Sequence, residues 1–270
     1  KWPKRKILCC NPEMYDWVYE LQTPEFQEGN KNVGLMQLGA FSDRVSELPR
    51  VDNSIIVNGK YEPRKGIDIA LEALRTLDMQ ATVQILHPLH TEDDAKAAVT
   101  ASQGHNLIPF AQSHEDVQAL YDVHHVAVFS SCAEGWNMGL TEALGQGCIV
   151  VASDISAHRY QYEIMCEYLG EEETDKRFIL VPAYEQPMKY HPRWYPAHIY
   201  AGHTWLESSS EDIAEGILQA LGMPFPEPWE EGQFPLSWEH AARRLLEEIA
   251  WTETLTTPST TPEDESSPST

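Results

Sequence analysis

The sequence predicts an α/β fold with a doubly wound parallel sheet, and two observations lead to this prediction. Over residues 54–221, short apolar segments alternate with segments whose apolar residues recur at helical spacing, which is typical of parallel strands joined by helices. The chain has 270 residues, of which 42% are hydrophobic, and this is enough for a buried core. We therefore expect one Rossmann-like domain in this span.

Six apolar segments are the predicted strands of this sheet. They cover residues 55–57, 83–86, 106–108, 126–129, 149–152 and 178–181. Helical spacing predicts helices over residues 67–74 and 117–121, and another over 210–221. Ser113 stands three residues before Asp116, which predicts a capping box where the second of these helices begins.

The two ends of the chain differ from the central domain. Residues 1–50 contain a predicted strand over 6–10 and a predicted helix over 14–21, but too little material for an independent core. We interpret them as the remnant of an N-terminal domain and an interdomain linker. Residues 51–251 form the main domain, which ends with an amphipathic helix over 238–251. Residues 252–270 are nearly all Thr, Ser, Pro and acidic residues, which predicts a disordered tail. Because the chain starts with Lys1 rather than Met, we expect a fragment or a processed product.

Residues 184–205 are rich in aromatic residues, proline and histidine and are longer than an ordinary loop between a strand and a helix. We interpret them as an elaboration on the scaffold, in the form of a packed aromatic loop. His191, His198 and His203 raise the alternative of a metal site. Their spacing matches no common metal-binding template, and we predict no metal.

The composition argues against several classes of partner. A formal net charge of −23 disfavours binding to nucleic acid or to an anionic membrane, which requires a basic surface. The five cysteines are odd in number and lack the paired spacing of metal ligands, so free thiols in a reducing, cytoplasmic compartment are predicted. No apolar run reaches the length of a signal-peptide core or a transmembrane segment.

A junction between a strand and a helix gives the strongest functional signal. A buried apolar strand over residues 125–129 leads into a helix pattern over 138–144, and seven residues separate Glu134 from Glu142. The carboxyl ends of strands and the N-termini of helices favour anions, which predicts a phosphate-bearing ligand. The two acids would repel phosphate, so we expect them to accept hydrogen bonds from sugar hydroxyls. Phosphate and sugar together indicate a nucleotide sugar.

A second group of candidate residues follows the first predicted strand. Lys60, Arg64 and Lys65 are three of only nineteen basic residues. Lysines in such turns often serve only as surface charge, but a position after a strand also suits diphosphate binding. We expect Arg64 to be a surface residue. Gly59 and Gly66 satisfy turn geometry, which is compatible with the approach of a ligand.

These two segments resemble a known family. Residues 58–66 read Asn-Gly-Lys-Tyr-Glu-Pro-Arg-Lys-Gly, and residues 130–153 contain both glutamates. They resemble the C-terminal, donor-binding half of GT-B-type retaining glycosyltransferases, the family with two glutamates separated by seven residues. The likeness extends over about residues 33–250. It implies that the predicted sheet is the C-terminal half of a GT-B fold.

The resemblance implies a hexose transfer from a nucleotide-sugar donor to an acceptor with retention. Lys60 and Lys65 would hold the donor diphosphate and stabilise it as it departs, with no metal or other cofactor. Glu134 would face the transferred hexose and position it rather than act as a nucleophile. The acceptor, a glycan, lipid or protein, would bind to an N-terminal acceptor-binding domain.

The remaining donor-binding residues implied by the resemblance lie at the strand end, in the turn and on the helix. Glu142 would accept the ribose hydroxyls, and the backbone amides of the turn would meet sugar and phosphate. For Trp136, core packing is an equal alternative to ligand contact. The full set is Gly59, Gly135, Trp136, Asn137, Met138 and Glu142.

Departures from the family pattern keep other functions open. Lys60 replaces the usual arginine, so that a point charge replaces a bidentate group. Asn137 stands where glycine is usual, although asparagine tolerates a left-handed backbone, and the loop 87–90 lacks the usual glycines. The alternative is a non-catalytic nucleotide-sugar or glycan binding module derived from a glycosyltransferase. A sugar-nucleotide epimerase with a GT-B fold fits the segment around Glu134 and Glu142 less well.

Overall fold

The computed structural model describes residues 7–20, 33–43, 48–85, 96, 99–100, 102–108, 113–189 and 196–254. The loop 87–90, His191 and residues 255–270 of the predicted tail lie outside the described residues.

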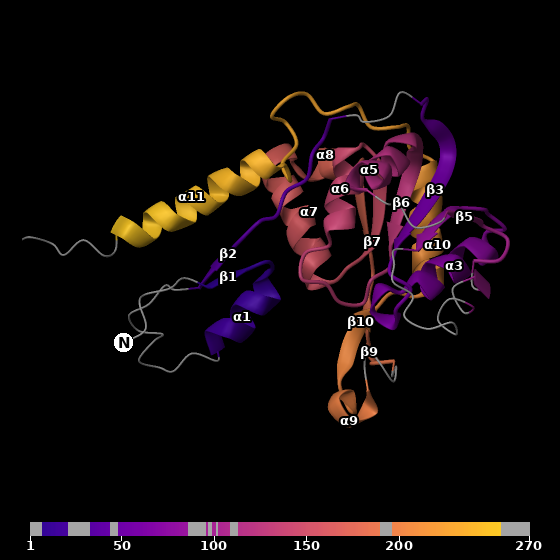
Figure 1. The fold of residues 1–270 in the computed structure, drawn as a ribbon, viewed down its shortest axis with the longest axis horizontal. Coiled ribbons are helices and arrows are strands. Elements are labelled where there is room, and N and C mark those ends of the chain that lie inside the picture. Colours follow the sequence, from indigo (N-terminus) through magenta and orange to yellow (C-terminus); the bar gives the residue numbers. More distant parts are fainter. Residues whose placement is uncertain are drawn as a thin grey trace, which may run out of the picture.

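A six-stranded parallel sheet forms the centre of the molecule (Figure 1). The predicted doubly wound parallel sheet is confirmed, because all neighbouring strands pair in parallel and each of the six predicted strands overlaps one of them. Across the sheet, the strands are β5 (Asn106–Ile108), β4 (Thr82–Ile85), β3 (Val51–Gly59), β6 (His124–Phe129), β7 (Ile149–Ser153) and β8 (Phe178–Val181).

The strand order defines where a ligand crevice lies. The chain starts the sheet with β3, adds β4 and β5 on one side, and then returns to add β6, β7 and β8 on the other. β3 and β6 are therefore neighbours, with Val57 opposite Val128. Open α/β sheets bind ligands beyond the carboxyl ends of the strands at this reversal. Here these ends are Gly59 of β3 and Phe129 of β6.

Helices cover both faces of the sheet. α3 (Ile67–Thr76) and α10 (Ser210–Leu221) share one buried core, whereas α5 (His114–Val123), α6 (Met138–Gly145) and α7 (Ser156–Leu169) share the other. Successive side chains of a strand point to opposite faces, so in β7 Val151 packs in the first core and Val150 in the second. The short α8 (Glu171–Asp175) then leads into β8. This two-sided burial explains why the strands are continuous apolar runs.

The predicted capping box is present at the start of α5. The Ser113 hydroxyl accepts a hydrogen bond from the backbone N–H of Asp116 at 3.1 Å, and the Asp116 carboxylate accepts one from the N–H of Ser113 at 3.0 Å. The box fixes the first turn of α5, which carries His114.

The N-terminal segment forms a small unit beside α7 (Figure 1). β1 (Ile7–Cys9) pairs in parallel with β2 (Val33–Leu35), and α1 (Pro12–Glu20) lies between them in sequence. The strand predicted over 6–10 and the helix predicted over 14–21 are therefore confirmed, although the helix begins two residues earlier. None of the residues of α1 is fully buried.

Two passages of chain touch each other, residues 37–40, which follow β2, and residues 235–238, which lead into α11. The backbone N–H of Ala40 donates to the carbonyl of Leu236 at 2.9 Å, and the side-chain amide of Gln37 donates to the carbonyl of Pro235 at 2.7 Å. At Gly39 a Cβ would collide with the Trp238 backbone. α11 (Trp238–Thr254) begins here and runs past residue 251, the end predicted for it.

A polar cavity of about 400 Å³ lies between β2, α7 and α11. Its lining residues are Leu35, Gln37, Tyr160, Arg244, Glu247 and Glu248.

Within the stretch 184–205, the described residues 184–189 and 196–205 belong to a hairpin rather than to the packed aromatic loop that was expected. β9 (Tyr184–Pro187) and β10 (Thr204–Glu207) pair in antiparallel fashion, with α9 (Ala197–Tyr200) between them in sequence. This hairpin projects from the sheet (Figure 1). Its described side chains are largely exposed, and Trp205 is a buried exception. For these residues the expectation is wrong, because the backbone pairs in a two-stranded extension and Tyr184 is exposed.

Gly66, between the turn η1 (Pro63–Lys65) and α3, has a left-handed backbone with φ of 59°. A Cβ at this position would collide with the carbonyl oxygen of Ser130. The strained backbone and the collision with Ser130 together predict that Gly66→Ala lowers the free energy of unfolding by about 3 kcal/mol. Urea denaturation would measure this loss.

Gly232→Ala is the matched control. Gly232 also has a positive φ, 74°, but a Cβ there meets no atom within 4 Å. We expect a loss of about 1 kcal/mol from backbone strain alone. Equal losses in the two variants would show that the close approach of Gly66 to Ser130 has no energetic role.

Candidate functional site

A cavity of about 370 Å³ opens at the carboxyl ends of β3 and β6, the position that the strand order defines. All the site residues predicted from the sequence line it, except Gly135 and Trp136. The lining residues are Asn58, Gly59, Lys60, Lys65, His114, Val117, Tyr121, Phe129, Glu134, Asn137, Met138, Gly139 and Glu142.

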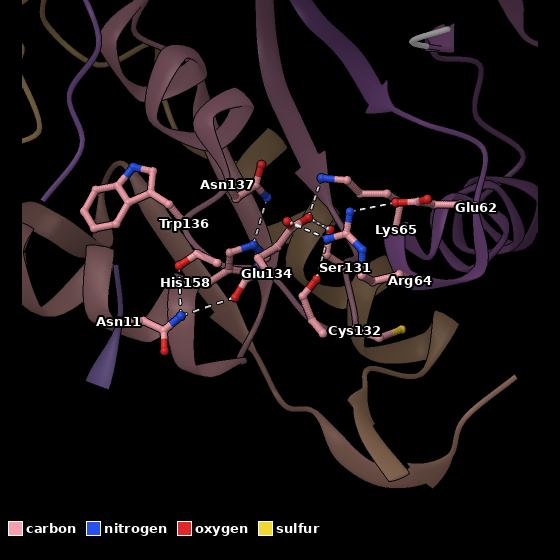
Figure 2. Close-up of polar contacts among 12 residues, drawn as sticks. Asn11, Glu62, Arg64, Lys65, Ser131, Cys132, Glu134, Trp136, Asn137 and His158 are labelled. Carbon is pink, nitrogen blue, oxygen red and sulfur yellow. Dashed lines mark hydrogen bonds and ion pairs between the residues drawn. The ribbon is translucent and has the colours of Figure 1, made fainter. Parts of the chain in front are cut away.

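Glu134 is held by three side chains from two neighbouring turns (Figure 2). Arg64 Nη1 lies 2.7 Å from Oε2, the Lys65 ammonium forms a short ion pair with Oε1, and the Ser131 hydroxyl donates to Oε1 at 2.9 Å. Only 7% of the Glu134 side chain is exposed. Burial acts to raise the pKa of Glu134, but the charges of Lys65 and Arg64 outweigh it and hold the pKa below its ordinary value. Glu134 is therefore a carboxylate at neutral pH.

Arg64 is not the surface residue that the sequence led us to expect. Its guanidinium joins Glu134 to Glu62, whose Oε1 lies 2.6 Å from Nη2, and it donates to the carbonyl of Ala133 at 2.7 Å. The turn η1 directs both Arg64 and Lys65 toward the loop after β6. The sequence showed a run of basic residues but not the long-range contact that orients them.

The loop that follows Glu134 is supported through its carbonyl groups. Each carbonyl from Ala133 to Trp136 accepts a hydrogen bond from a side chain outside the loop. The donors are Arg64 for Ala133, Asn11 for Glu134 and Gly135, and Gln161 for Trp136. In a trans peptide the N–H points opposite to the carbonyl, so these contacts also fix the directions of the following N–H groups.

Asn137 ends this loop and precedes the first residue of α6. Its φ of 73° is in the left-handed region, which confirms the expected reason why asparagine is tolerated here. Its side-chain amide lies 2.9 Å from Nε2 of His158, and Nδ1 of His158 lies 2.8 Å from the carbonyl of Ser153. Nδ1 must donate to that carbonyl, so Nε2 accepts from Asn137. Complete burial lowers the pKa of His158 to about 4, and the ring is neutral.

His158, Asn58 and Tyr121 were not predicted as site residues from the sequence. The side-chain amide of Asn58 donates to the Tyr121 hydroxyl at 2.7 Å in the cavity wall, and Tyr121 is fully buried. Tyr121 was identified only as an apolar position of a helix. His158 lies five residues after the end of the two-glutamate segment 130–153, and no local signal marks it as part of the site.

The Trp136 side chain packs in the core and does not line the cavity. It is 3% exposed, its Nε1 donates to Thr141 Oγ1 at 2.9 Å, and its ring meets Tyr160 edge to face. Of the two alternatives given for Trp136, core packing and contact with the ligand, the side chain shows core packing.

Glu142 lies on α6 within the cavity lining. Its carboxylate is 3.5 Å from Nδ1 of His114. Burial raises the pKa of Glu142, an effect that the nearby His114 opposes. A buried carboxylate without strong cationic partners favours neutral hydrogen-bond donors such as sugar hydroxyls.

A second cavity of about 330 Å³ borders the other side of the Glu134 loop. Glu13 of α1, Ser156 of α7 and the hairpin residues Glu185 and Thr204 contribute to its walls. Glu134 lines both cavities. Among the described residues, no group of three or more His, Cys, Asp or Glu side chains could hold a metal ion.

Comparison with known proteins agrees with this fold. Residues 52–181 match the model of the family described as "Glycosyl transferases group 1". No curated protein matches the chain.

Several solved structures are similar to the chain. One is sucrose-phosphate synthase from Thermosynechococcus elongatus, with 14% identity and a TM-score of 0.53 over 92% of this chain and 58% of that one. The chain is also similar to α,α-trehalose 6-phosphate synthase from Burkholderia multivorans, with 9% identity and a TM-score of 0.52 over 83% and 52%. A third similar structure is TarM of S. aureus, with 12% identity and a TM-score of 0.52 over 93% and 44%.

The chain spans about half the length of these solved structures. None of the helices within the described ranges is long and apolar enough to cross a membrane. The fold is an α/β fold that matches GT-B glycosyltransferase structures, and its central segment matches the group 1 glycosyl transferases.

Proposed function

We propose that this chain is the donor-binding half of a retaining glycosyltransferase, which transfers a hexose from a nucleoside-diphosphate donor to an acceptor. One observation carries the proposal: a single cavity at the reversal of the sheet combines Lys60, Lys65, the start of α6 and Glu142. The two lysines and the first amides of α6 suit a diphosphate. Glu142, on α6, suits the hydroxyls of a ribose.

The cluster around Glu134 supports its role in positioning the donor. Both carboxylate oxygens already accept hydrogen bonds from Arg64, Lys65 and Ser131. Either oxygen is a poor nucleophile, because attack on a sugar would require it to leave the cation that it contacts, Arg64 for Oε2 or Lys65 for Oε1. Glu134 instead orients Lys65 and receives the hydroxyls of the hexose at the rim of the cavity.

The transfer proceeds on one face of the donor. The bond between the anomeric carbon and the phosphate oxygen breaks, and its electron pair leaves with the nucleoside diphosphate. The acceptor oxygen forms the new bond to the anomeric carbon from the same face, and its proton passes to the departing phosphate oxygen. Lys60, Lys65 and the α6 amides stabilise the negative charge that develops there, and the loss of one such donor costs about 3 kcal/mol.

The acceptor side of the reaction belongs to a further, N-terminal domain. Residues 7–20 and 33–35, the described part of this segment, form a unit that hydrogen-bonds to the Glu134 loop through Asn11 and that is too small for a core of its own. We propose that it is the end of this acceptor-binding domain, that the acceptor is a glycan, lipid or protein, and that the protein acts in the cytoplasm.

Calorimetric titration with UDP, GDP and ADP, followed by the matching hexose conjugates, tests donor binding. We expect saturable binding of one nucleotide. Lys65→Ala and Glu142→Ala should each weaken it by about tenfold, because each removes a charged hydrogen-bonding group. Lys176→Ala is the control, since Lys176 is exposed and pairs with Glu172 and Glu173 away from the cavity.

A folded chain that binds none of the three nucleotides contradicts the proposed donor site. The alternative, a non-catalytic glycan binding module, has one observation in its favour: Glu134 partly neutralises Arg64 and Lys65, the cations nearest to it. Binding of neutral oligosaccharides without binding of nucleotide would establish that alternative.

A further inference from the structure

Asn11 connects the N-terminal segment to the candidate site (Figure 2). Its side-chain amide nitrogen lies 2.8 Å from the carbonyl of Gly135 and 3.4 Å from that of Glu134. Its Oδ1 accepts from the backbone N–H of Met14 at 2.9 Å and from the Ser156 hydroxyl at 3.4 Å. Asn11 is 2% exposed. Both donor hydrogens and both acceptor positions of the amide therefore have partners.

These contacts divide into two functions. The first function is that of an N-cap. Asn11 Oδ1 accepts a hydrogen bond from the backbone N–H of Met14, a group in the first turn of α1 that has no partner within the helix. Donation to Glu134 and Gly135 concerns a segment more than 120 residues away in sequence. A role in α1 alone does not require the two donated hydrogen bonds, since a serine or aspartate would also cap the helix.

The donated hydrogen bonds fix two peptide groups of the loop that joins Glu134 to Asn137, two residues that line the proposed donor cavity. Holding the carbonyl of Glu134 orients the N–H of Gly135, and holding the carbonyl of Gly135 orients the N–H of Trp136, because both belong to planar trans peptides. The side of Gly135 on which a Cβ would stand is open, with no atom within 4 Å. This side leaves room for a ligand at the loop, while Asn11 holds the backbone through its carbonyl groups.

We propose that Asn11 is a positioning residue, which aligns the N–H groups of Gly135 and Trp136 for the sugar and phosphate of the donor. The carbonyls of Ala133 and Trp136 accept hydrogen bonds from Arg64 and Gln161, which belong to the sheet domain. Asn11, in contrast, belongs to the N-terminal segment, between β1 and α1. The donor loop therefore has its working geometry only when the N-terminal segment is docked. This inference rests on the proposed function.

Asn11→Ser in the full 270-residue chain tests the proposal. Serine retains the cap of α1 but is too short to reach the carbonyl of Gly135. We expect the affinity for the hexose conjugate of the preferred nucleotide to fall about tenfold. In the ligand-free chain, the Gly135 and Trp136 amides should shift in ¹H–¹⁵N NMR spectra, and they should exchange with solvent about tenfold faster.

A second variant, Asn11→Asp, keeps both acceptor contacts and loses both donors. It should give the same amide changes if the serine variant does not fold. Trp17→Ala is the control, because Trp17 is an exposed residue of α1.

The two readouts separate the possible failures. If the wild-type chain binds no nucleotide, the proposed function fails, and the amide signals still decide whether Asn11 positions the loop. If the Asn11 variants keep the amide signals and exchange rates of the wild type, the positioning role is overturned. If the amides change while the affinity for the hexose conjugate stays the same, Asn11 is structural only and the proposal is also overturned.

Discussion

Glu134→Gln is expected to raise the affinity for the preferred nucleoside diphosphate about tenfold, which corresponds to about 1.4 kcal/mol, while it destabilises the fold. The substitution removes the negative charge that holds Lys65 and Arg64, so both cations become available to phosphate. The free energy of unfolding should fall by about 2 kcal/mol. Breaking a fully buried ion pair typically lowers the free energy of unfolding by about 3–5 kcal/mol. The loss expected here is smaller, because the side chains of Arg64 and Lys65 are 27% and 19% exposed. Calorimetric titration and urea denaturation measure the two effects.

Ser131→Ala is the matched control for this experiment. It removes a neutral hydrogen bond to the same carboxylate oxygen but leaves the charges in place. Stability should fall by about 1 kcal/mol, and the affinity for the diphosphate should not rise. A Glu134→Gln variant that binds the diphosphate more weakly than the wild type would show that Glu134 does not compete with phosphate for these cations.

Acid should destabilise the protein through His158, and His158→Gln should remove this part of the effect. The pKa of His158 falls from 6.5 to about 4 on folding, because the buried ring resists protonation. The folded state therefore binds fewer protons than the unfolded state between these values. The stabilisation is complete above pH 6.5 and is lost as the pH falls through 4, a total of about 3 kcal/mol.

The comparison of two pH values isolates most of this contribution, because acidic groups and histidines that do not interact with His158 titrate equally in both proteins. Glu134 is the acidic group that does interact with it. Glutamine can donate to the carbonyl of Ser153 and accept from Asn137, so it keeps the hydrogen bonds of the neutral ring. Between pH 7.5 and pH 4, the free energy of unfolding of His158→Gln should decrease by about 3 kcal/mol less than that of the wild type. Equal decreases in both proteins would exclude His158 as the group responsible.

The sheet could be predicted from the sequence because its strands are covered on both faces. A segment such as residues 149–152 is apolar at every position, and the adjacent helices show a regular spacing of apolar residues. The positions of Glu134 and Glu142 in the cavity lining could be predicted for a related reason, since the two residues lie where a strand ends and a helix begins. The hairpin of β9 and β10 could not, because its exposed strands carry no burial pattern.

The supporting contacts of the site could not be predicted, because they are long-range. Arg64 meets Glu134 across 70 residues and Asn11 meets Gly135 across 124. A sequence shows that an arginine or an asparagine is present but not which distant backbone it reaches. His158 shows the same limit, since its role depends on complete burial beneath Asn137, and burial of a single histidine has no local sequence signal.

The contact between the two passages of chain, residues 37–40 and 235–238, has a mechanical consequence. Hydrogen bonds of 2.9 and 2.7 Å join the residues that follow β2 to those that precede α11. The unit of β1, α1 and β2 is therefore attached to the rest of the molecule at two separate places, at this contact and where Asn11 meets the Glu134 loop. Two attachments restrain the orientation of the unit more than one would, so the contact near Gly39 helps to keep Asn11 within reach of the loop.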